Sequence, residues 1–456
     1  LGAPFFHNPT KHNFEPRVGF AWDPFRDGKT SVRGAFGVFD VLPLNYEFFN
    51  ALNTGLPYVE SLFSSALDTT SFPTGVVGQL GVNQSALAAT YVQFDPPRNY
   101  VMIWNLNVQR QLTSSTTLSV GYVGNHGVHM LNREDDVNST LPISMQQGLL
   151  WPTVNGGPTS RVNPAFGQLR GDFWGGDASY NALQVGVTKR LSHGLQAQGS
   201  YTWGKGIDTG SASVVGDPFQ NSISTLYWFC PACRRGLSDY DIKHTLVVNA
   251  IWDVPGPKSW GGVASHVLGG WQLGGIFTAE TGVPFTPKIG GDPLGLNNFD
   301  PYDFPDRSTG SGCGTGVNSS NPNQYINLSC FSLPVASSAN AAQCRPFGYV
   351  PGGNPGIAGT CANLLGTTGR NSVVGPGLMT LDFSLFKNNY IRSISENFNI
   401  QFRFEAFNIM NRPNFEPPID NSALFNWSGN PVGGAGAVDA TSTTSRQLQF
   451  GLKVVF

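Results

Sequence analysis

The last eleven residues of the chain, 446–456, alternate strictly between two kinds of side chain. One set is apolar throughout, and the other is polar or small until the final step. A strand of about ten residues with these two faces suits a wall that has lipid on one side and water on the other. Strands of soluble sandwiches are usually about five or six residues long. The apolar set consists of Leu448, Phe450, Leu452, Val454 and Phe456. This ending therefore predicts one strand of a membrane-spanning β-barrel.

Ten further segments show the same alternation, which brings the predicted number of strands to eleven. In the segment 398–406, for example, Phe402 and Phe404 alternate with Arg403 and Glu405. The ten segments are 14–22, 30–38, 101–112, 117–125, 178–190, 195–205, 243–254, 271–281, 379–387 and 398–406.

The connections between these segments alternate between short and long. The short ones are 23–29, 113–116, 191–194, 255–270 and 388–397, and the long ones are 39–100, 126–177, 206–242, 282–378 and 407–445. Soluble domains rarely contain structureless loops longer than about 15 residues. Strict alternation places all long loops at one end, as in outer-membrane barrels with short periplasmic turns and long extracellular loops. We therefore predict an all-β protein, a transmembrane antiparallel β-barrel of the bacterial outer membrane.

Composition agrees with this prediction and excludes other classes. Charged residues make up 12% of the chain, about half the share in soluble proteins, and the formal net charge is −2. Without a basic run, nucleic acid is not an expected partner. No apolar run approaches the 18 or more residues of a membrane helix, so residence in a membrane requires a closed barrel. A large soluble sandwich or propeller does not explain the alternating loop lengths, and no internal repeat supports a propeller.

Short stretches along nearly the whole chain resemble the Oar-like branch of TonB-dependent outer-membrane receptors. They are FEPRVGFAW at 14–22, YVGNHG at 122–127, GWQLGGIFT at 270–278, GVPFT at 282–286, GRN at 369–371, GPG at 375–377, DFSLFK at 382–387, QFRFEAFNIMN at 401–411 and PNF at 413–415. The resemblance implies a 22-strand barrel that is filled by an N-terminal plug and coupled to the TonB system. Residues 1–456 would then be the C-terminal half of the barrel, with the plug and N-terminal regions absent.

Two further observations agree with a partial barrel. Single-chain bacterial barrels use an even number of strands, whereas eleven are predicted here. The chain begins at Leu1 without a secretion signal, so a mature product or a fragment is expected.

The resemblance implies TonB-energised uptake of a large, unknown solute. Its expected partners are outer-membrane lipid, the TonB system through the missing plug, and the barrel assembly machinery through the C-terminal strand. A barrel-anchored surface binding or adhesion protein is the alternative, and a soluble carbohydrate-binding β-protein is a third possibility.

Polar residues on the inner face are the candidates for contact with a solute or plug. They are Glu280, Asp382, Gln401, Arg403, Glu405, Gln449 and Lys453. If 379–387 and 398–406 pair across the turn 388–397, Leu385 faces Ile400 and Phe383 faces Phe402. Asp382 then lies opposite Arg403, and Ser384 opposite Gln401. A structural ion-pair ladder is the alternative role for these residues.

All six cysteines fall in long loops: Cys230, Cys233, Cys313, Cys330, Cys344 and Cys361. An even count in an oxidising compartment predicts up to three disulfides, and three pairings of the last four remain open. Cys230 and Cys233 also have the spacing of half a zinc site or a redox motif. A zinc ribbon needs a second such pair, and a redox site needs a thioredoxin-like context. Neither is present in the sequence.

No other constellation predicts chemistry. His126 and His129 lie in a predicted loop without a third ligand at a fixed spacing. Asp292, Asp300, Asp303 and Asp306 lack the order of a calcium loop and suit turns. Because catalytic motifs are also absent, we predict no enzyme, no metal and no cofactor. Five tryptophans are expected at the membrane interfaces: Trp22, Trp104, Trp203, Trp252 and Trp271.

Overall fold

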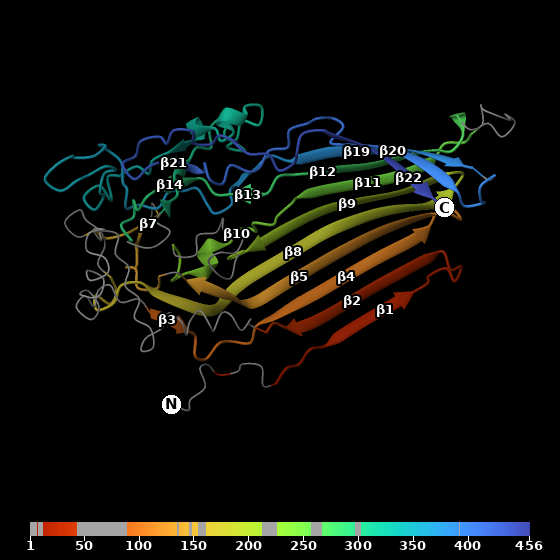
Figure 1. The fold of residues 1–456 in the computed structure, drawn as a ribbon. Coiled ribbons are helices and arrows are strands. Elements are labelled where there is room, and N and C mark those ends of the chain that lie inside the picture. The colour runs from red at the N-terminus through yellow and green to blue at the C-terminus, as the bar shows by residue number, and fades with distance from the viewer. Residues whose placement is uncertain are drawn as a thin grey trace, which may run out of the picture.

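A single large sheet dominates the computed structural model, which describes residues 7, 12–42, 89–134, 136–145, 148–153, 161–211, 226–256, 267–296, 302–391 and 393–456. Eleven strands follow one another in chain order, and each is antiparallel to the next (Figure 1). They are β1 Arg17–Trp22, β2 Thr30–Asp40, β4 Tyr100–Gln111, β5 Thr116–Glu134, β8 Leu169–Ser192, β9 Leu195–Asp208, β11 His244–Asp253, β12 Trp271–Glu280, β19 Leu378–Tyr390, β20 Asn399–Phe407 and β22 Gln447–Val455. Each coincides with one of the eleven predicted strands.

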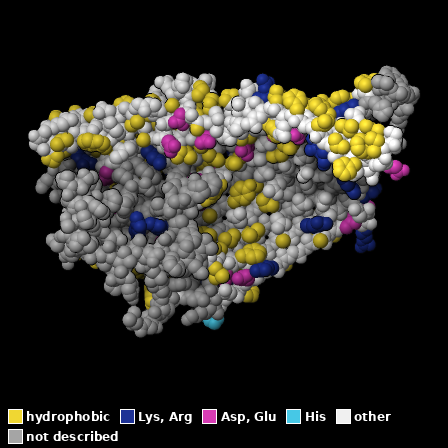
Figure 2. Space-filling model, viewed as in Figure 1, with side chains coloured by type: hydrophobic (Ala, Val, Ile, Leu, Met, Phe, Trp, Pro, Cys, Tyr) yellow, Lys and Arg dark blue, Asp and Glu magenta, His cyan; other side chains and the backbone are white. Residues whose placement is uncertain are grey.

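The register aligns apolar side chains of neighbouring strands on one face of the sheet. Between β20 and β22, Phe402 lies opposite Leu452, and Phe404 lies opposite Phe450. Phe450 and Leu452 are 67% and 72% exposed. An extended surface of exposed large apolar side chains is stable in lipid and not in water. We call this face the outer face and the opposite one the inner face. Figure 2 looks into the hollow of the curved sheet.

The five tryptophans predicted at the membrane interfaces all lie on the outer face by register. Trp252 and Trp271 lie near the short turns, and Trp203 lies toward the other end of its strand. From Leu195 to Trp203 the strand rises about 26 Å. That span is similar to the roughly 25 Å height of a lipid-facing band in outer-membrane barrels.

Long connections lie at one end of the sheet and short turns at the other (Figure 1). The tightest turn joins β8 to β9, where Ser192 pairs with Leu195. His193 and Gly194 both have positive φ, at 52° and 76°. This combination matches the two-residue type I′ turn, whose twist fits antiparallel strands.

Strands β5 and β8 extend well beyond the predicted segments 117–125 and 178–190. Their ladder continues until Glu134 pairs with Gly171, so both ends of the predicted loop 126–177 are strand. The register shifts between Val128 and Met130, where His129 has a φ of +53°. Such a bulge inserts an extra residue and inverts the alternation, which hides the rest of the strand from a period-two reading. His126 and His129 therefore lie in a strand and not in a loop.

The predicted register between β19 and β20 is wrong by four residues. Leu385 pairs with Phe404 and Phe383 with Ala406, instead of with Ile400 and Phe402. The reason is that β19 continues to Tyr390, which pairs with Asn399 and shortens the turn. An even shift leaves every side chain on its predicted face while it changes each opposite residue.

The buried core lies mainly in the external loops, which form small sheets of their own. In one cluster, Phe285 and Val373 pack with Ile326 and Leu424. A second contains Trp151, Leu294 and Phe304. No helix in the described ranges is long and apolar enough to cross a membrane.

The small strands lie beside or beyond the main sheet. They are β3 Ala89–Val92, β6 Ile143–Met145, β7 Gly148–Leu150, β10 Gly236–Leu237, β13 Pro284–Phe285, β14 Lys288–Gly290, β15 Tyr302–Asp303, β16 Asp306–Arg307, β17 Phe331–Ser332, β18 Val373–Val374 and β21 Ala423–Phe425. Among the described residues, 3₁₀ turns also occur at η3 Pro231–Arg234, η4 Pro322–Gln324 and η5 Leu328–Cys330. Strands β3 and β10 pair with β8 and β9, so they continue the main sheet at its external end.

Candidate functional site on the inner face and in the external loops

The seven polar candidates all lie on the inner face by register. Glu405 lies opposite Ser384 on one side and Gln449 on the other, and Gln401 lies opposite Lys453. The remaining candidates are Glu280, Asp382 and Arg403, which occupy β12, β19 and β20. The structure therefore brings five of the seven together on the last two strands.

Contacts among these residues differ from the predicted ladder. Arg403 lies opposite Phe386, and its guanidinium carbon is 5.3 Å from the centre of that ring. Its Nε donates to Oε1 of Gln401 at 2.5 Å. Asp382 instead accepts a hydrogen bond from the backbone N of Asn408 at 2.8 Å. The predicted pairs of Asp382 with Arg403 and of Ser384 with Gln401 are thus wrong, because of the four-residue shift.

Asn388 is a member of this network that the sequence analysis missed. Its Oδ1 accepts from Nε2 of Gln401 at 2.8 Å and from Nδ2 of Asn399 at 3.0 Å. Residue 388 was assigned to the turn, so its side chain had no predicted face. Because β19 continues to Tyr390, Asn388 lies in this strand, and its side chain belongs to the inner face.

The inner face also carries exposed apolar side chains. Ile103, Ile251 and Ile276 are 43%, 46% and 51% exposed and point to this face by register. They lie in β4, β11 and β12 of the main sheet. A lumen filled only with water would not favour them, because exposed apolar area is unfavourable in water.

Two buried ion pairs hold the external loops to the ends of β5 and β9. Arg234 contacts Glu134 at 2.6 Å, and both side chains are almost completely buried. Arg370 forms a buried pair with Asp208 and also donates to the backbone oxygens of Arg234 and Leu237. Buried charges of this kind are tolerated only when they are paired and hydrogen-bonded. The two pairs therefore attach two external loops to these strand ends, the β9–β11 connection through Arg234 and the β12–β19 connection through Arg370.

Asn371 extends this attachment. Its Nδ2 donates to Leu237 O at 2.7 Å and to Asp239 Oδ1 at 2.6 Å. Its backbone N donates to Oγ1 of Thr286 at 2.9 Å, and its φ is +53°. The sequence motif at 369–371 marked this place, but its role in joining loops was not predicted.

A cavity of about 510 Å³ lies beside this attachment, at the external end of the inner face. Asn125, Tyr180 and Asp208 line it from the strands, and Tyr240 and Asp241 line it from a loop. Oδ1 of Asp241 accepts from the backbone N of Gly206 at 2.6 Å. Burial raises the pKa of Asp241, and Lys205 and Lys243 partly oppose that effect.

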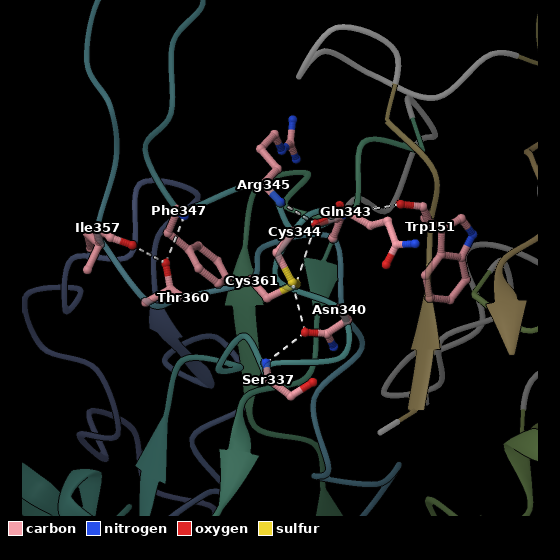
Figure 3. Close-up of a disulfide and its surroundings, with 11 residues drawn as sticks. Trp151, Ser337, Asn340, Gln343, Cys344, Arg345, Phe347, Ile357, Thr360 and Cys361 are labelled. Atoms are coloured by element: carbon pink, nitrogen blue, oxygen red, sulfur yellow. Dashed lines mark hydrogen bonds between the residues drawn. A yellow bond between two sulfur atoms is a disulfide. The ribbon is translucent and has the colours of Figure 1, made fainter. Parts of the chain in front are cut away.

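The six cysteines form three disulfides in the structure. Cys230 is joined to Cys233, Cys313 to Cys330 and Cys344 to Cys361. The last two bridges each span 17 residues, and Cys330 and Cys361 are fully buried in loop clusters. Figure 3 shows the bridge between Cys344 and Cys361 with its hydrogen-bonded surroundings.

The predicted turn role of the loop aspartates has local support. Oδ1 of Asp292 accepts from Leu296 N at 2.8 Å, as in a turn, whereas Oδ1 of Asp306 accepts from Thr367 N at 2.9 Å, which is 61 residues away. Burial raises the pKa of Asp303 well above its usual value, and its Oδ1 accepts from Phe304 N. Asp300 lies outside the described residues. Within the part of the chain that is described, no three His, Cys, Asp or Glu side chains gather as a metal would need.

Comparison with solved structures finds outer-membrane proteins at low identity. The outer membrane transporter YddB from Escherichia coli is 7% identical with a TM-score of 0.46, covering 96% of this chain and 40% of its own. The FrpB iron transporter from Neisseria meningitidis is 10% identical with a TM-score of 0.40, with coverage of 96% and 39%. The ferripyoverdine receptor of Pseudomonas aeruginosa is 10% identical with a TM-score of 0.39, with coverage of 96% and 32%. The chain thus spans less than half the length of these proteins.

Among curated proteins, no match was found. The sequence profile of a family described as "Outer membrane beta barrel domain" matches residues 2–449, nearly the whole chain. The exposed outer face and the ordered antiparallel sheet are the features that such a domain requires. The chain belongs to the outer membrane beta-barrel domain family, and its place is the bacterial outer membrane.

Proposed function

We propose that this chain is the C-terminal half of a 22-strand, TonB-dependent receptor that takes up a large solute across the outer membrane. The observation that carries the proposal is the inner face, which combines charged side chains with exposed isoleucines. A plug domain packed inside the barrel would cover the apolar side chains and leave polar ones for a solute.

The edges of the sheet support the partial-barrel aspect of the proposal. In the described part of the chain, β1 pairs only with β2, and β22 pairs only with β20. Unpaired backbone groups at such edges cannot face lipid, because no water is present there to satisfy them. Eleven further strands would close the sheet and bring the count to an even number. The outer-face residues of β22, from Leu448 to Val454, and the Phe456 that follows the strand would then serve barrel assembly.

The loop assembly supports capture of a solute at the surface. Its buried ion pairs, three disulfides and small cores hold the loops in fixed positions. A preorganised surface binds with a smaller loss of conformational entropy. The buried carboxylates Glu134 and Asp208 are each paired with an arginine, which supports a structural role for these two residues. The alternative is a barrel that only anchors this binding surface.

Cysteine labelling in cells separates uptake from anchoring. Ser384→Cys adds a thiol to the inner face, and Leu385→Cys adds one to the outer face as a matched control. The native cysteines are all in disulfides and do not react. For energised uptake, we expect a water-soluble maleimide to label Ser384→Cys at different rates in cells with and without TonB, and to leave Leu385→Cys unlabelled. Equal rates for Ser384→Cys in both strains would contradict energised uptake and favour anchoring.

A further inference from the structure

The external loop assembly contains a second cavity, of about 410 Å³, whose walls come from two different loops. One wall is Ile143, Leu150 and Pro152, from the connection between β5 and β8. The other is Arg345, Pro346 and Tyr349, from the connection between β12 and β19. The volume is within the range of about 300–1,000 Å³ that is typical of small-molecule sites.

The two walls are fixed to each other by a buried asparagine. Asn363 is fully buried, and its Nδ2 donates to Trp151 O at 2.7 Å and to Gln343 O at 2.9 Å. Its Oδ1 accepts from the backbone N of Arg345 at 2.7 Å. The disulfide between Cys344 and Cys361 braces the same wall. The cavity is therefore built by the fold before any ligand arrives.

Arg345 is the one charged residue among the described residues that line this cavity. Figure 3 shows its side chain extending away from the disulfide. A guanidinium has five N–H donors. In Arg345, Nη2 uses one of them to donate to Pro293 O. Burial lowers the pKa of Arg345, and Asp292, which does not line the cavity, partly opposes that effect. A half-buried cation of this kind is stabilised by an anion that approaches through the cavity.

The remaining lining combines polar and apolar side chains, so an apolar group can pack beside the negative charge. Ile143, Pro152 and Pro346 supply apolar surface, and Tyr349 adds an aromatic ring with a polar end, whereas Leu150 is fully buried and offers none. The planar guanidinium matches a carboxylate through two parallel hydrogen bonds. With one cation in the site and Asp292 nearby, a single negative charge is better matched than the double charge of a phosphate monoester.

We propose that this cavity is a subsite for a carboxylate with an apolar or aromatic body, which Arg345 would bind by its charge and Ile143 and Tyr349 would contact by their side chains. The inference rests on the proposed function, because it names the chemical class of solute that the loops would capture. The whole solute is larger than the cavity, so the site would hold one acidic, apolar part of it.

The test is calorimetric titration of 2-naphthoate, and of its neutral analogue 2-naphthamide, into the full-length protein in non-ionic detergent. We expect Arg345→Gln to weaken naphthoate binding about tenfold to a hundredfold and to leave naphthamide binding unchanged. Arg345→Lys should retain part of the affinity, because it keeps the charge and loses the planar fork. Arg412→Gln removes an exposed cation from another external loop and should bind naphthoate like the wild type.

Three results would overturn the subsite. The first is equal affinity for naphthoate and naphthamide. The second is unchanged naphthoate affinity in an Arg345→Gln variant whose loops resist protease as in the wild type. The third is tighter binding of 2-naphthyl phosphate than of naphthoate. Binding by the purified protein requires neither TonB nor transport. Failure of the uptake proposal would therefore leave naphthoate binding intact, and failure of the subsite would leave TonB-dependent labelling intact.

Discussion

In strand β22, Phe450 and Leu452 are 67% and 72% exposed, whereas in the external loops Phe285 and Phe347 are completely buried. The same kind of side chain thus points outward in one region and inward in the other. Charged side chains are distributed in the opposite way. Arg370 and Asp208 are buried where the loops meet the strands, whereas Lys453 is exposed on the inner face of the sheet. The difference shows that lipid is the solvent of the outer face and water is the solvent around the loops.

This comparison also separates two sources of stability. The strands depend on backbone hydrogen bonds between neighbours, and their apolar surface is matched by lipid. The loops depend on small apolar cores, three disulfides and two buried ion pairs, as a small soluble domain does. Variants should therefore affect one region without the other.

The largest effect is expected from Arg370→Ala. It leaves the buried Asp208 carboxylate without its partner, which costs about 3–5 kcal/mol for a buried pair. Limited proteolysis should show loops that are cut much faster, while the unheated protein still migrates as a folded barrel in gels. The double variant Arg370→Met with Asp208→Leu should recover much of the protection. Equal protease resistance in Arg370→Ala and Arg412→Ala would contradict a structural role for the pair.

A charge on the outer face should have the opposite regional effect. Phe450→Arg places a cation against lipid, which costs about 2–4 kcal/mol near the middle of the bilayer. Gln449→Arg changes the neighbouring position on the inner face, opposite Glu405, and serves as the control. We expect Phe450→Arg to reduce the amount of assembled protein in outer-membrane fractions, and Gln449→Arg to assemble normally. Similar losses in both variants would break the distinction between the two faces.

The disulfides should differ from one another according to the length of chain that each encloses. Replacing Cys313 and Cys330 by serine opens a loop of 17 residues, which corresponds to about 3 kcal/mol in the chain-entropy description. The bridge of Cys230 and Cys233 spans three residues and should contribute about half as much. Thermal unfolding of the loops, followed by protease sensitivity, would measure the ranking. Mass spectrometry without reductant should find no free thiol, and alkylation of six cysteines would refute all three bridges.

The smallest effect concerns pH. Burial raises the pKa of Asp241 above its usual value of 3.8, so the charged carboxylate destabilises the folded loops. Stability from this group is present at low pH and is lost as pH rises through the folded pKa. Asp241→Asn keeps an acceptor for the Gly206 amide and removes the titration. The variant should be more stable than the wild type at pH 7, and the difference should disappear below pH 3.8. A difference that is constant with pH would exclude this explanation.

Period-two alternation was sufficient to locate all eleven strands and to assign their faces, because a strand places successive side chains on opposite sides whatever its neighbours are. Residues such as Phe402 and Arg403 were assigned correctly to the outer and inner faces for that reason. The approximate positions of the loops could also be predicted, since loops are the intervals between alternating segments.

The sequence failed where the outcome depended on a partner strand or on distant residues. The bulge at His129 interrupts the alternation, so the extension of β5 to Glu134 became visible only from its pairing with β8. The register of β19 and β20 depended on where Tyr390 meets Asn399, and an even shift leaves the alternation of both strands unchanged.

The sequence by itself determined the strand count, the two faces and the loops at one end, because these properties follow from the local period of the chain. Only the tertiary structure decided that Arg370 pairs with Asp208, 162 residues away, and that Asn363 joins the wall of Arg345 to that of Trp151. Such contacts arise from the packing of loops that are distant in sequence. No local pattern encodes them, since many partners would satisfy the same side chain equally well.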